Sequence, residues 1–159
     1  MAKKYSRRMV LKRLLIDSTY NSPKVEFDPD LGYLSLSGKS IPENATKLYH
    51  PLSLWIKEYV KVAIEETNLH LNLEYFNTAS SIWIARLIKF LAQIDDPEKL
   101  LIIHLYFDIE EFDEMEEEDV KEAIAPATDV IADAKLSVGI KIYGKDQNDS
   151  ILKEKLILF

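Results

Sequence analysis

Three hydroxyl side chains that could carry chemistry stand close together, at Thr78, Ser80 and Ser81. The alternating residues 70–76 before them predict a strand, and the apolar residues 82–94 after them predict a helix. The hydroxyls would then lie at the amino end of that helix, where backbone N–H groups and the helix dipole favour negative charge. A hydroxyl in that place can cap the helix, or it can carry a phosphate that the helix end stabilises. The residue types alone leave both roles open.

Motifs for other chemistry are missing from the sequence. It contains neither of the glycine-rich phosphate-binding fingerprints G-x-x-x-x-G-K-[ST] and G-x-G-x-x-G. It also lacks a G-x-S-x-G nucleophile elbow. The three histidines, His50, His70 and His104, lack metal-ligand spacing, so we expect structural roles for them. Without cysteine there is no disulfide or thiolate site. We therefore predict that the protein is not an enzyme and that it holds neither a metal nor a cofactor.

Composition narrows the class of protein further. At 159 residues the chain fits one domain, and no apolar run is long enough to cross a membrane, so we expect a cytoplasmic protein without membrane insertion. Its net charge of -7 argues against nucleic acid as a partner. Basic residues gather in 1–13 and acidic residues in 108–122. These blocks are either solvated surface or regions that steer protein partners.

The periodicity of the chain predicts a single α/β domain. Its mixed sheet should have about five to six strands, made of an N-terminal hairpin and a βαβ unit, packed with two to three helices. The expected strands cover residues 24–28, 33–37, 70–76, 100–107 and 136–143. The expected helices cover 45–64, 80–94 and 114–131, the last interrupted by Pro126. Residues 145–159 form a peripheral tail, for which strand, helix and irregular structure all stay open.

The helix after Ser81 is apolar around most of its circumference. Among residues 82–94 the polar side chains are Arg86, Lys89 and Gln93, which form a narrow stripe. One apolar face must cover the sheet. A second face, which includes Trp83, either packs against a neighbouring helix or serves as a surface for a partner or for a homodimer.

Several ordered blocks of the sequence resemble the SiaC family of bacterial regulatory phosphoproteins. They are Ser22-Pro23-Lys24-Val25-Glu26-Phe27-Asp28-Pro29, residues 36–44, and Leu48-Tyr49-His50-Pro51-Leu52-Ser53-Leu54-Trp55. The most specific block is Tyr75-Phe76-Asn77-Thr78-Ala79-Ser80-Ser81, which is similar to the family's Y-[LF]-N-T-S-S segment. The resemblance extends over residues 15–107.

This resemblance implies a STAS-like fold and a switch of the kind used by anti-sigma-factor antagonists. A dedicated kinase would phosphorylate Thr78, a PP2C-type phosphatase would remove the phosphate, and the unphosphorylated form would bind an output protein such as a diguanylate cyclase. The partner-binding residues implied are Asn77, Ala79, Ser80, Ser81, Ile82, Trp83 and Arg86. The chain departs from the family at three of them, with Ala79 for Ser, Ile82 for Lys and Arg86 for an acidic residue.

Two other interpretations stay open at this point. The protein could be an interaction module without a switch, in which Thr78 only caps the helix. It could also be a small enzyme in which Glu43, Asn44, Asn77 and Thr78 line a polar pocket.

Overall fold

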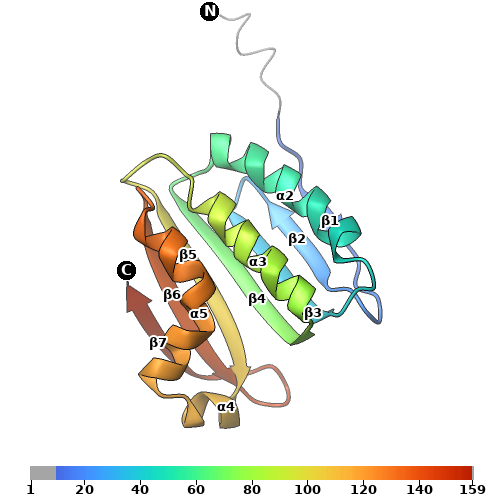
Figure 1. Cartoon of the computed structure of the whole chain (residues 1–159), viewed down its shortest axis with the longest axis vertical. Helices are drawn as coiled ribbons and strands as arrows, with labels where there is room; N and C mark the ends of the chain where they lie inside the picture. The colour runs from blue at the N-terminus through green and yellow to red at the C-terminus, as the bar shows by residue number, and fades with distance from the viewer. Residues whose placement is uncertain (1–9, 159) are drawn as a thin grey trace, which may run out of the picture.

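Seven strands form one mixed sheet in the order in which they occur along the chain, as Figure 1 shows. The structure is a computed structural model and describes residues 10–158. The strands are β1 (Leu14–Ile16), β2 (Lys24–Asp28), β3 (Tyr33–Ser40), β4 (Glu66–Phe76), β5 (Leu100–Asp108), β6 (Ser137–Lys145) and β7 (Ile151–Leu158). Strands β3 to β6 are parallel to one another, and the outer pairs β1–β2, β2–β3 and β6–β7 are antiparallel.

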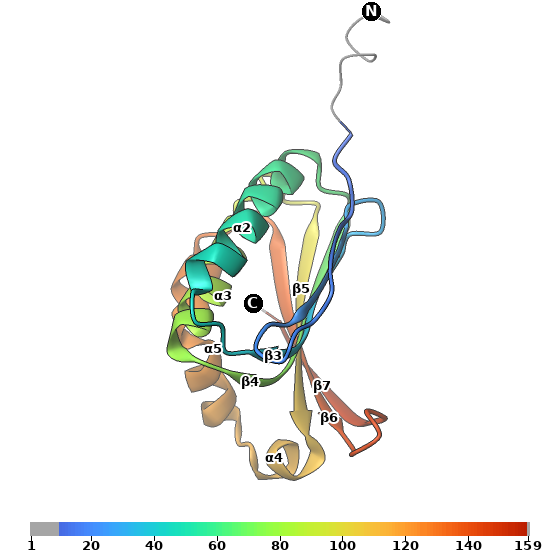
Figure 2. The ribbon, with the colours of Figure 1, turned by 90° about the vertical axis from the view of Figure 1, so that its right-hand side faces the viewer.

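The helices of the described residues all lie on one face of this sheet (Figure 2). They are α2 (Ala45–Val62), α3 (Thr78–Leu91), α4 (Ile109–Glu114) and α5 (Glu117–Ala132). The strand order explains this arrangement, because β3, β4, β5 and β6 follow one another in a single direction across the sheet. Right-handed crossovers that always advance in the same direction place every helix on the same side. None of these helices is long and apolar enough to span a bilayer.

The predicted single α/β domain with a mixed sheet is confirmed, including the β2–β3 hairpin and the parallel βαβ unit. The sheet is wider than expected because two edge strands join it. Strand β1 is too short for periodicity to reveal, and the segment left open at the C-terminus pairs with β6 as β7. Most of the basic segment 1–13 lies outside the described residues.

The helical region differs from the prediction in two places. The acidic residues after β5 form the short helix α4, which periodicity did not indicate. Helix α5 was expected to break at Pro126, but it continues through this residue. Proline removes one N–H donor from a helix. Most of the described side chains of α5 are exposed, so water can bind the carbonyl group that is left without its partner.

On the face of the sheet opposite the helices, side chains of neighbouring strands stack on and form hydrogen bonds with one another. His70 and His104 are cross-strand neighbours on β4 and β5, and their rings stack with centroids 4.0 Å apart. The Nδ1 atoms of the two histidines lie 2.7 Å from the hydroxyls of Tyr106 and Tyr143, respectively. His104 Nε2 lies 2.7 Å from Asn68 Oδ1, which accepts its hydrogen. Both histidines therefore have the structural roles that the sequence predicts.

This packing controls the protonation of His104. Its pKa is lowered to about 3, first by burial and then by its neighbours His70 and Lys141. Burial also lowers the pKa of His70. The folded protein thus holds a neutral imidazole at a pH at which the unfolded chain, with a histidine pKa near 6.5, takes up a proton.

We expect the free energy of unfolding to fall as the pH drops from about 6.5 toward 4. A depressed histidine pKa gives stability that is complete above the unfolded pKa and is lost below it, with a slope of at most about 1.4 kcal/mol per pH unit for each proton. Replacing the imidazole in His104→Asn should make this slope shallower in urea unfolding series. His50→Asn, at an exposed position of α2, is the matched control, and an unchanged slope in His104→Asn would contradict the explanation.

Candidate functional site

Thr78 is the first residue of α3, and its side chain is exposed. The cap of the helix is the preceding residue, Asn77, whose Oδ1 accepts a hydrogen bond of 2.9 Å from the backbone N–H of Ser80. Within residues 10–158 the Thr78 hydroxyl has no hydrogen-bond partner. The interpretation of Thr78 as the capping residue is therefore wrong. An Asn side chain at the cap position reaches the third N–H of the helix, which leaves the next residue free.

Ser80 has a different environment, because it is 0% exposed. Its Oγ lies 2.9 Å from the carbonyl oxygen of Ser40, to which it donates, and 2.8 Å from Ser40 Oγ. Since the Ser80 hydroxyl donates to the carbonyl, Ser40 Oγ must donate to Ser80, and the Tyr49 hydroxyl donates to Ser40 in turn. Burial raises the pKa of Tyr49, so this hydroxyl keeps its proton.

These bonds join the end of β3, helix α2 and the start of α3. The backbone N–H of Asn77 also donates to the Ser40 carbonyl, at 3.0 Å, and the Asn77 side-chain amide lies 3.4 Å from the carbonyl of Pro42. Ser80 was predicted for the partner surface together with its neighbours. The structure places its side chain inside the fold, where it holds the junction that presents Thr78.

The other predicted residues form a mixed surface on α3. Ala79 is exposed, Ile82 is 50% exposed, and Ser81 is half-buried with its hydroxyl 2.8 Å from the Thr78 carbonyl. Trp83 is half-buried and stacks on Tyr49 of α2, with ring centroids 6.3 Å apart.

The guanidinium group of Arg86 lies 4.8 Å from the centre of the Trp83 ring. The second apolar face of α3 therefore packs partly on α2, and its outer side stays accessible.

Large exposed side chains also precede Thr78 at the end of β4. Phe76, two residues before Thr78, is 57% exposed, and Tyr75 is 65% exposed. Phe76 and Ile82, which is also exposed, line one apolar cavity, whereas the ring of Tyr75 lies 5.8 Å from the ammonium group of Lys39. Exposed apolar patches of this kind are typical of protein interfaces.

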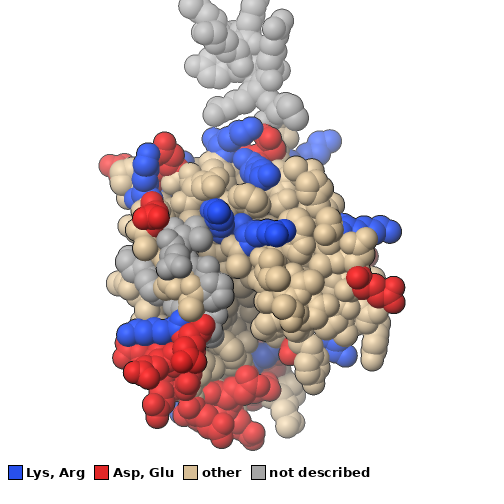
Figure 3. All heavy atoms as spheres, in the orientation of Figure 1, with Lys and Arg blue, Asp and Glu red and all other residues tan. Residues whose placement is uncertain are grey.

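An apolar groove of about 620 Å³ continues this surface. It lies between α3 and the end of β5, and Figure 3 shows the surface hollowed beside the acidic cluster of α4 and α5. Apolar side chains of β4, α3 and β5 line it, among them Leu73, Phe76, Ile82, Ile88, Leu105 and Phe107. Arg86 and Lys89 on one side and Glu111 on the other add charge to the lining.

Sequence reasoning did not find this groove, although the apolar circumference of α3 was a signal for it. The sequence analysis gave one apolar face to the sheet and a second face to a neighbouring helix or a partner, and the structure also brings Ile84 and Ile88 to this groove. The polar pocket considered for an enzyme has no counterpart there, since Glu43, Asn44, Asn77 and Thr78 do not line the groove. Asn44 instead caps α2 by accepting from the N–H of Lys47.

The acidic run is divided between two helices. Its first part forms α4, and its second part opens α5 with a capping box between Glu116 and Asp119. Acidic side chains in the first turn of a helix are stabilised by the helix dipole. The run thus has a local structural role, and it also forms the strongly negative surface in Figure 3.

We expect Ser80→Ala to lower the free energy of unfolding by about 1–3 kcal/mol, because the variant leaves the buried hydroxyl of Ser40 without its acceptor. Ser81→Ala is the matched control on the same helix turn and should change it by less than about 0.5 kcal/mol. Urea unfolding measures both variants. Equal stabilities would show that the buried serine bonds do not hold the junction.

Comparison with known proteins places these features in a family. The model of the SiaC family of regulatory phosphoproteins matches residues 16–130. An uncharacterised protein of Pseudomonas aeruginosa strain UCBPP-PA14 is 33% identical over 67 residues, which are 42% of this chain and 53% of the relative. The chain thus matches about half the length of that curated relative.

Solved structures agree with the family model. SiaC of Pseudomonas aeruginosa is 26% identical, with a TM-score of 0.57, over 65% of this chain and 90% of SiaC. A chain in the crystal structure of the Pseudomonas aeruginosa diguanylate cyclase SiaD with its activator SiaC has a TM-score of 0.62. That match covers 82% of this chain and 99% of the other, and at 23% identity it concerns the fold alone. Because the family model covers well over half of the sequence, this chain belongs to the SiaC family of regulatory phosphoproteins.

Proposed function

We propose that this chain is a non-catalytic, cytoplasmic signalling adaptor that is switched by phosphorylation of Thr78 and that activates a diguanylate cyclase. The observation that carries the proposal is the exposed Thr78 hydroxyl, which has no partner within the described residues and stands next to an apolar surface. The chain's family is one of regulatory phosphoproteins, and Pseudomonas aeruginosa SiaC is the activator of a diguanylate cyclase.

The start of α3 can stabilise the negative charge of a phosphate. The first N–H groups of a helix have no partners inside the helix, and Asn77 takes the N–H of Ser80, which leaves those of Thr78 and Ala79. A phosphate of about -1.5 to -2 charges at this end is favoured by about 0.3–1 kcal/mol at an exposed site. Because the cap does not involve Thr78, phosphorylation would leave the fold intact.

The same charge would oppose a docked partner. In an interface that includes Phe76, Ile82 and the apolar groove, a phosphate on Thr78 would lose its water without gaining a matched cation. Uncompensated burial of a charge costs several kcal/mol, which corresponds to a loss of binding of two orders of magnitude or more. We propose that the unphosphorylated form therefore binds the cyclase and that the phosphorylated form does not.

A cognate protein kinase and a PP2C-type phosphatase complete the proposed switch. Both enzymes must reach the Thr78 hydroxyl, so their binding sites overlap with that of the cyclase. The departures Ala79, Ile82 and Arg86 lie on this surface. Ile82 is apolar where the family commonly has lysine, so we expect the partner to present an apolar contact at that position.

The test uses the diguanylate cyclase of the same organism and measures the rate of cyclic di-GMP formation from GTP. We expect the wild type to activate the cyclase and Thr78→Glu to reduce activation at least tenfold, because the carboxylate brings charge into the interface. The melting temperature should change by only a few degrees, since the Thr78 side chain makes no bonds within residues 10–158.

The matched control is Thr78→Val, which keeps the shape of threonine without the hydroxyl and should activate like the wild type. Mass spectrometry of protein from native cells should find a phosphate on Thr78. Activation by Thr78→Glu equal to that by the wild type would contradict the switch. Failure of the wild type to activate would contradict the choice of partner.

A further inference from the structure

The ammonium group of Lys39 lies close to two exposed tyrosine rings at the end of β3. Its Nζ atom is 4.8 Å from the centre of the Tyr20 ring and 5.8 Å from the centre of the Tyr75 ring. Tyr20 is 80% exposed and Tyr75 is 65% exposed. An ammonium group at such distances is attracted to the face of an aromatic ring. We call these three side chains the Tyr–Lys patch.

The Tyr–Lys patch lies on the face of the sheet without helices, next to the start of α3. The residue after Lys39 is Ser40, whose buried hydroxyl bonds to side chains of α2 and α3, and side chains alternate between the two faces of a strand. Tyr75 is the cross-strand partner of Lys39 and shares its face. Tyr75 also precedes Thr78 by three residues. The patch and the surface around Thr78 therefore meet at one edge of the sheet.

A bulge in the sheet positions Lys39. The pairing of β3 with β4 shifts between Gly38 and Lys39, so Glu74 is an extra residue and Lys39 lies opposite Tyr75. Gly38 has a φ of 105°, a backbone conformation that favours glycine over other residues. Bulges are rare between parallel strands, and where they occur they change the direction of nearby side chains, often beside a functional site. The bulge thus gives a reason to look for a function of Lys39.

Hydrogen bonds hold the turn that carries Tyr20. Thr19 Oγ1 accepts from the backbone N–H of Ser22 at 3.0 Å. The backbone N–H of Ile41, directly after β3, donates to the carbonyl oxygen of Asn21 at 2.9 Å. The turn is therefore attached to the same end of β3 that carries the lysine. An exposed aromatic side chain on a fixed support loses little conformational freedom when a partner covers it.

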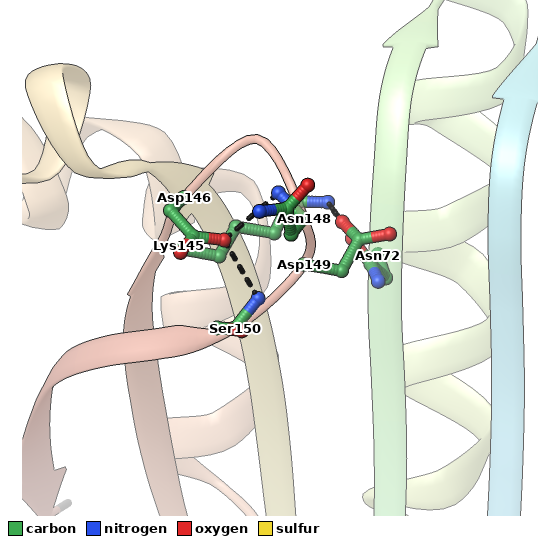
Figure 4. Close-up of polar contacts among 6 residues, drawn as sticks. All are labelled: Asn72, Lys145, Asp146, Asn148, Asp149 and Ser150. Atoms are coloured by element: carbon green, nitrogen blue, oxygen red, sulfur yellow. Dashed lines mark hydrogen bonds and ion pairs between the residues drawn. The ribbon is translucent and has the colours of Figure 1, made fainter.

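The charge of Lys39 distinguishes it from the other lysines of strands β2 to β6. Each of those has a carboxylate partner, in the pairs Lys24–Glu26 at 2.7 Å, Lys141–Glu154 at 3.7 Å and Lys145–Asp149 at 2.9 Å. Figure 4 shows that Lys145 also donates to the side-chain oxygen of Asn72, at 2.8 Å. Lys39 has neither a carboxylate partner nor a hydrogen-bond acceptor among residues 10–158. Its positive charge is therefore available to another molecule.

A partner that covers the Tyr–Lys patch must supply a negative charge. Contact removes water from the ammonium group, and a charge that is buried without a counter-ion is costly. A carboxylate of the partner would compensate for the lost water. The two tyrosine rings suit apolar or aromatic atoms beside that carboxylate, and tyrosine is enriched among the residues that contribute most to protein binding. The complementary surface is thus an Asp or Glu side chain with apolar neighbours.

The size of the patch indicates which partner this is. A stable complex buries about 800 Å² on each protein, far more than three side chains offer. The partner must therefore extend onto an adjoining surface. The surface at the same edge of the sheet is the one around Thr78, with the exposed side chains of Phe76 and Ile82.

We propose that the Tyr–Lys patch is a second anchor for the diguanylate cyclase, which places a carboxylate side chain on Lys39. This inference rests on the proposed function, because the cyclase is the partner proposed for the Thr78 surface. The two parts of the interface have different tasks. Phosphorylation of Thr78 decides whether the complex forms, and the ion pair at Lys39 adds affinity and selects a partner with an acidic residue at that place.

The test measures the Kd of the full-length chain for the purified diguanylate cyclase of the same organism by biolayer interferometry. We expect Lys39→Met, which keeps the length of the side chain without its charge, to weaken binding about tenfold or more. Tyr20→Ala should weaken it about threefold or more, because an exposed aromatic contact is lost. Lys39→Arg keeps the charge and should bind within about twofold of the wild type.

Salt dependence gives a second measurement that a merely structural effect would not change. Raising sodium chloride from about 50 to about 500 mM should weaken binding by the wild type more than binding by Lys39→Met, since salt screens the ion pair. Lys155→Met, at an exposed position of the edge strand β7, and Leu31→Ala, in the turn between β2 and β3, are the matched controls. Both should bind like the wild type.

The outcomes separate this inference from the proposed switch. Binding by Lys39→Met as tight as that by the wild type, or an equal loss in Lys39→Met and Lys155→Met, would overturn the anchor and leave the switch at Thr78 standing. Absence of binding by the wild type would overturn the choice of the cyclase as partner, and the anchor with it.

Discussion

The hand of the crossover connections is the constraint on which the rest of this structure depends. Because β3, β4, β5 and β6 advance in one direction, right-handed crossovers put all described helices on the same face. This places the start of α3 at the carboxyl edge of β4, with its N–H groups directed outward. It also leaves the second face of the sheet without a helical layer. On that face the rings of His70 and His104 stack on each other and form hydrogen bonds with tyrosine hydroxyls.

The sequence was sufficient to predict strands β2 to β6, helices α2 and α3, and the position of Thr78 between β4 and α3, but it missed β1 and α4. Alternation predicted β2 and β3, and the change from alternation to an apolar helix located the junction after Asn77. It was not sufficient for the roles of the three hydroxyls. Ser80 is buried because Ser40, forty residues earlier in the chain, ends its strand beside it. Such a contact depends on the pairing of β3 with β4, which local periodicity does not contain.

The groove was missed for the same reason. It is built from α3 and from strands β4, β5 and β6, and no single segment carries its pattern. Ser35 and Ser37 read along the chain as the solvent side of an alternating strand. Only in the sheet do they lie beside His70 and Tyr106, on the face opposite the helices.

The cap of α3 has an evolutionary consequence. Asn77 and Ser80 make the bonds that hold the junction, and Thr78 between them makes none with its side chain within residues 10–158. Substitutions at position 78 are therefore close to neutral for folding, and selection there acts on recognition alone. Asn77 and Ser80 have the opposite character: their side chains hold the junction, so they tolerate little change, whichever protein the surface meets. In the course of evolution, the phosphorylation site can therefore be gained, lost or replaced by a permanent charge at this one position without changes elsewhere in the fold.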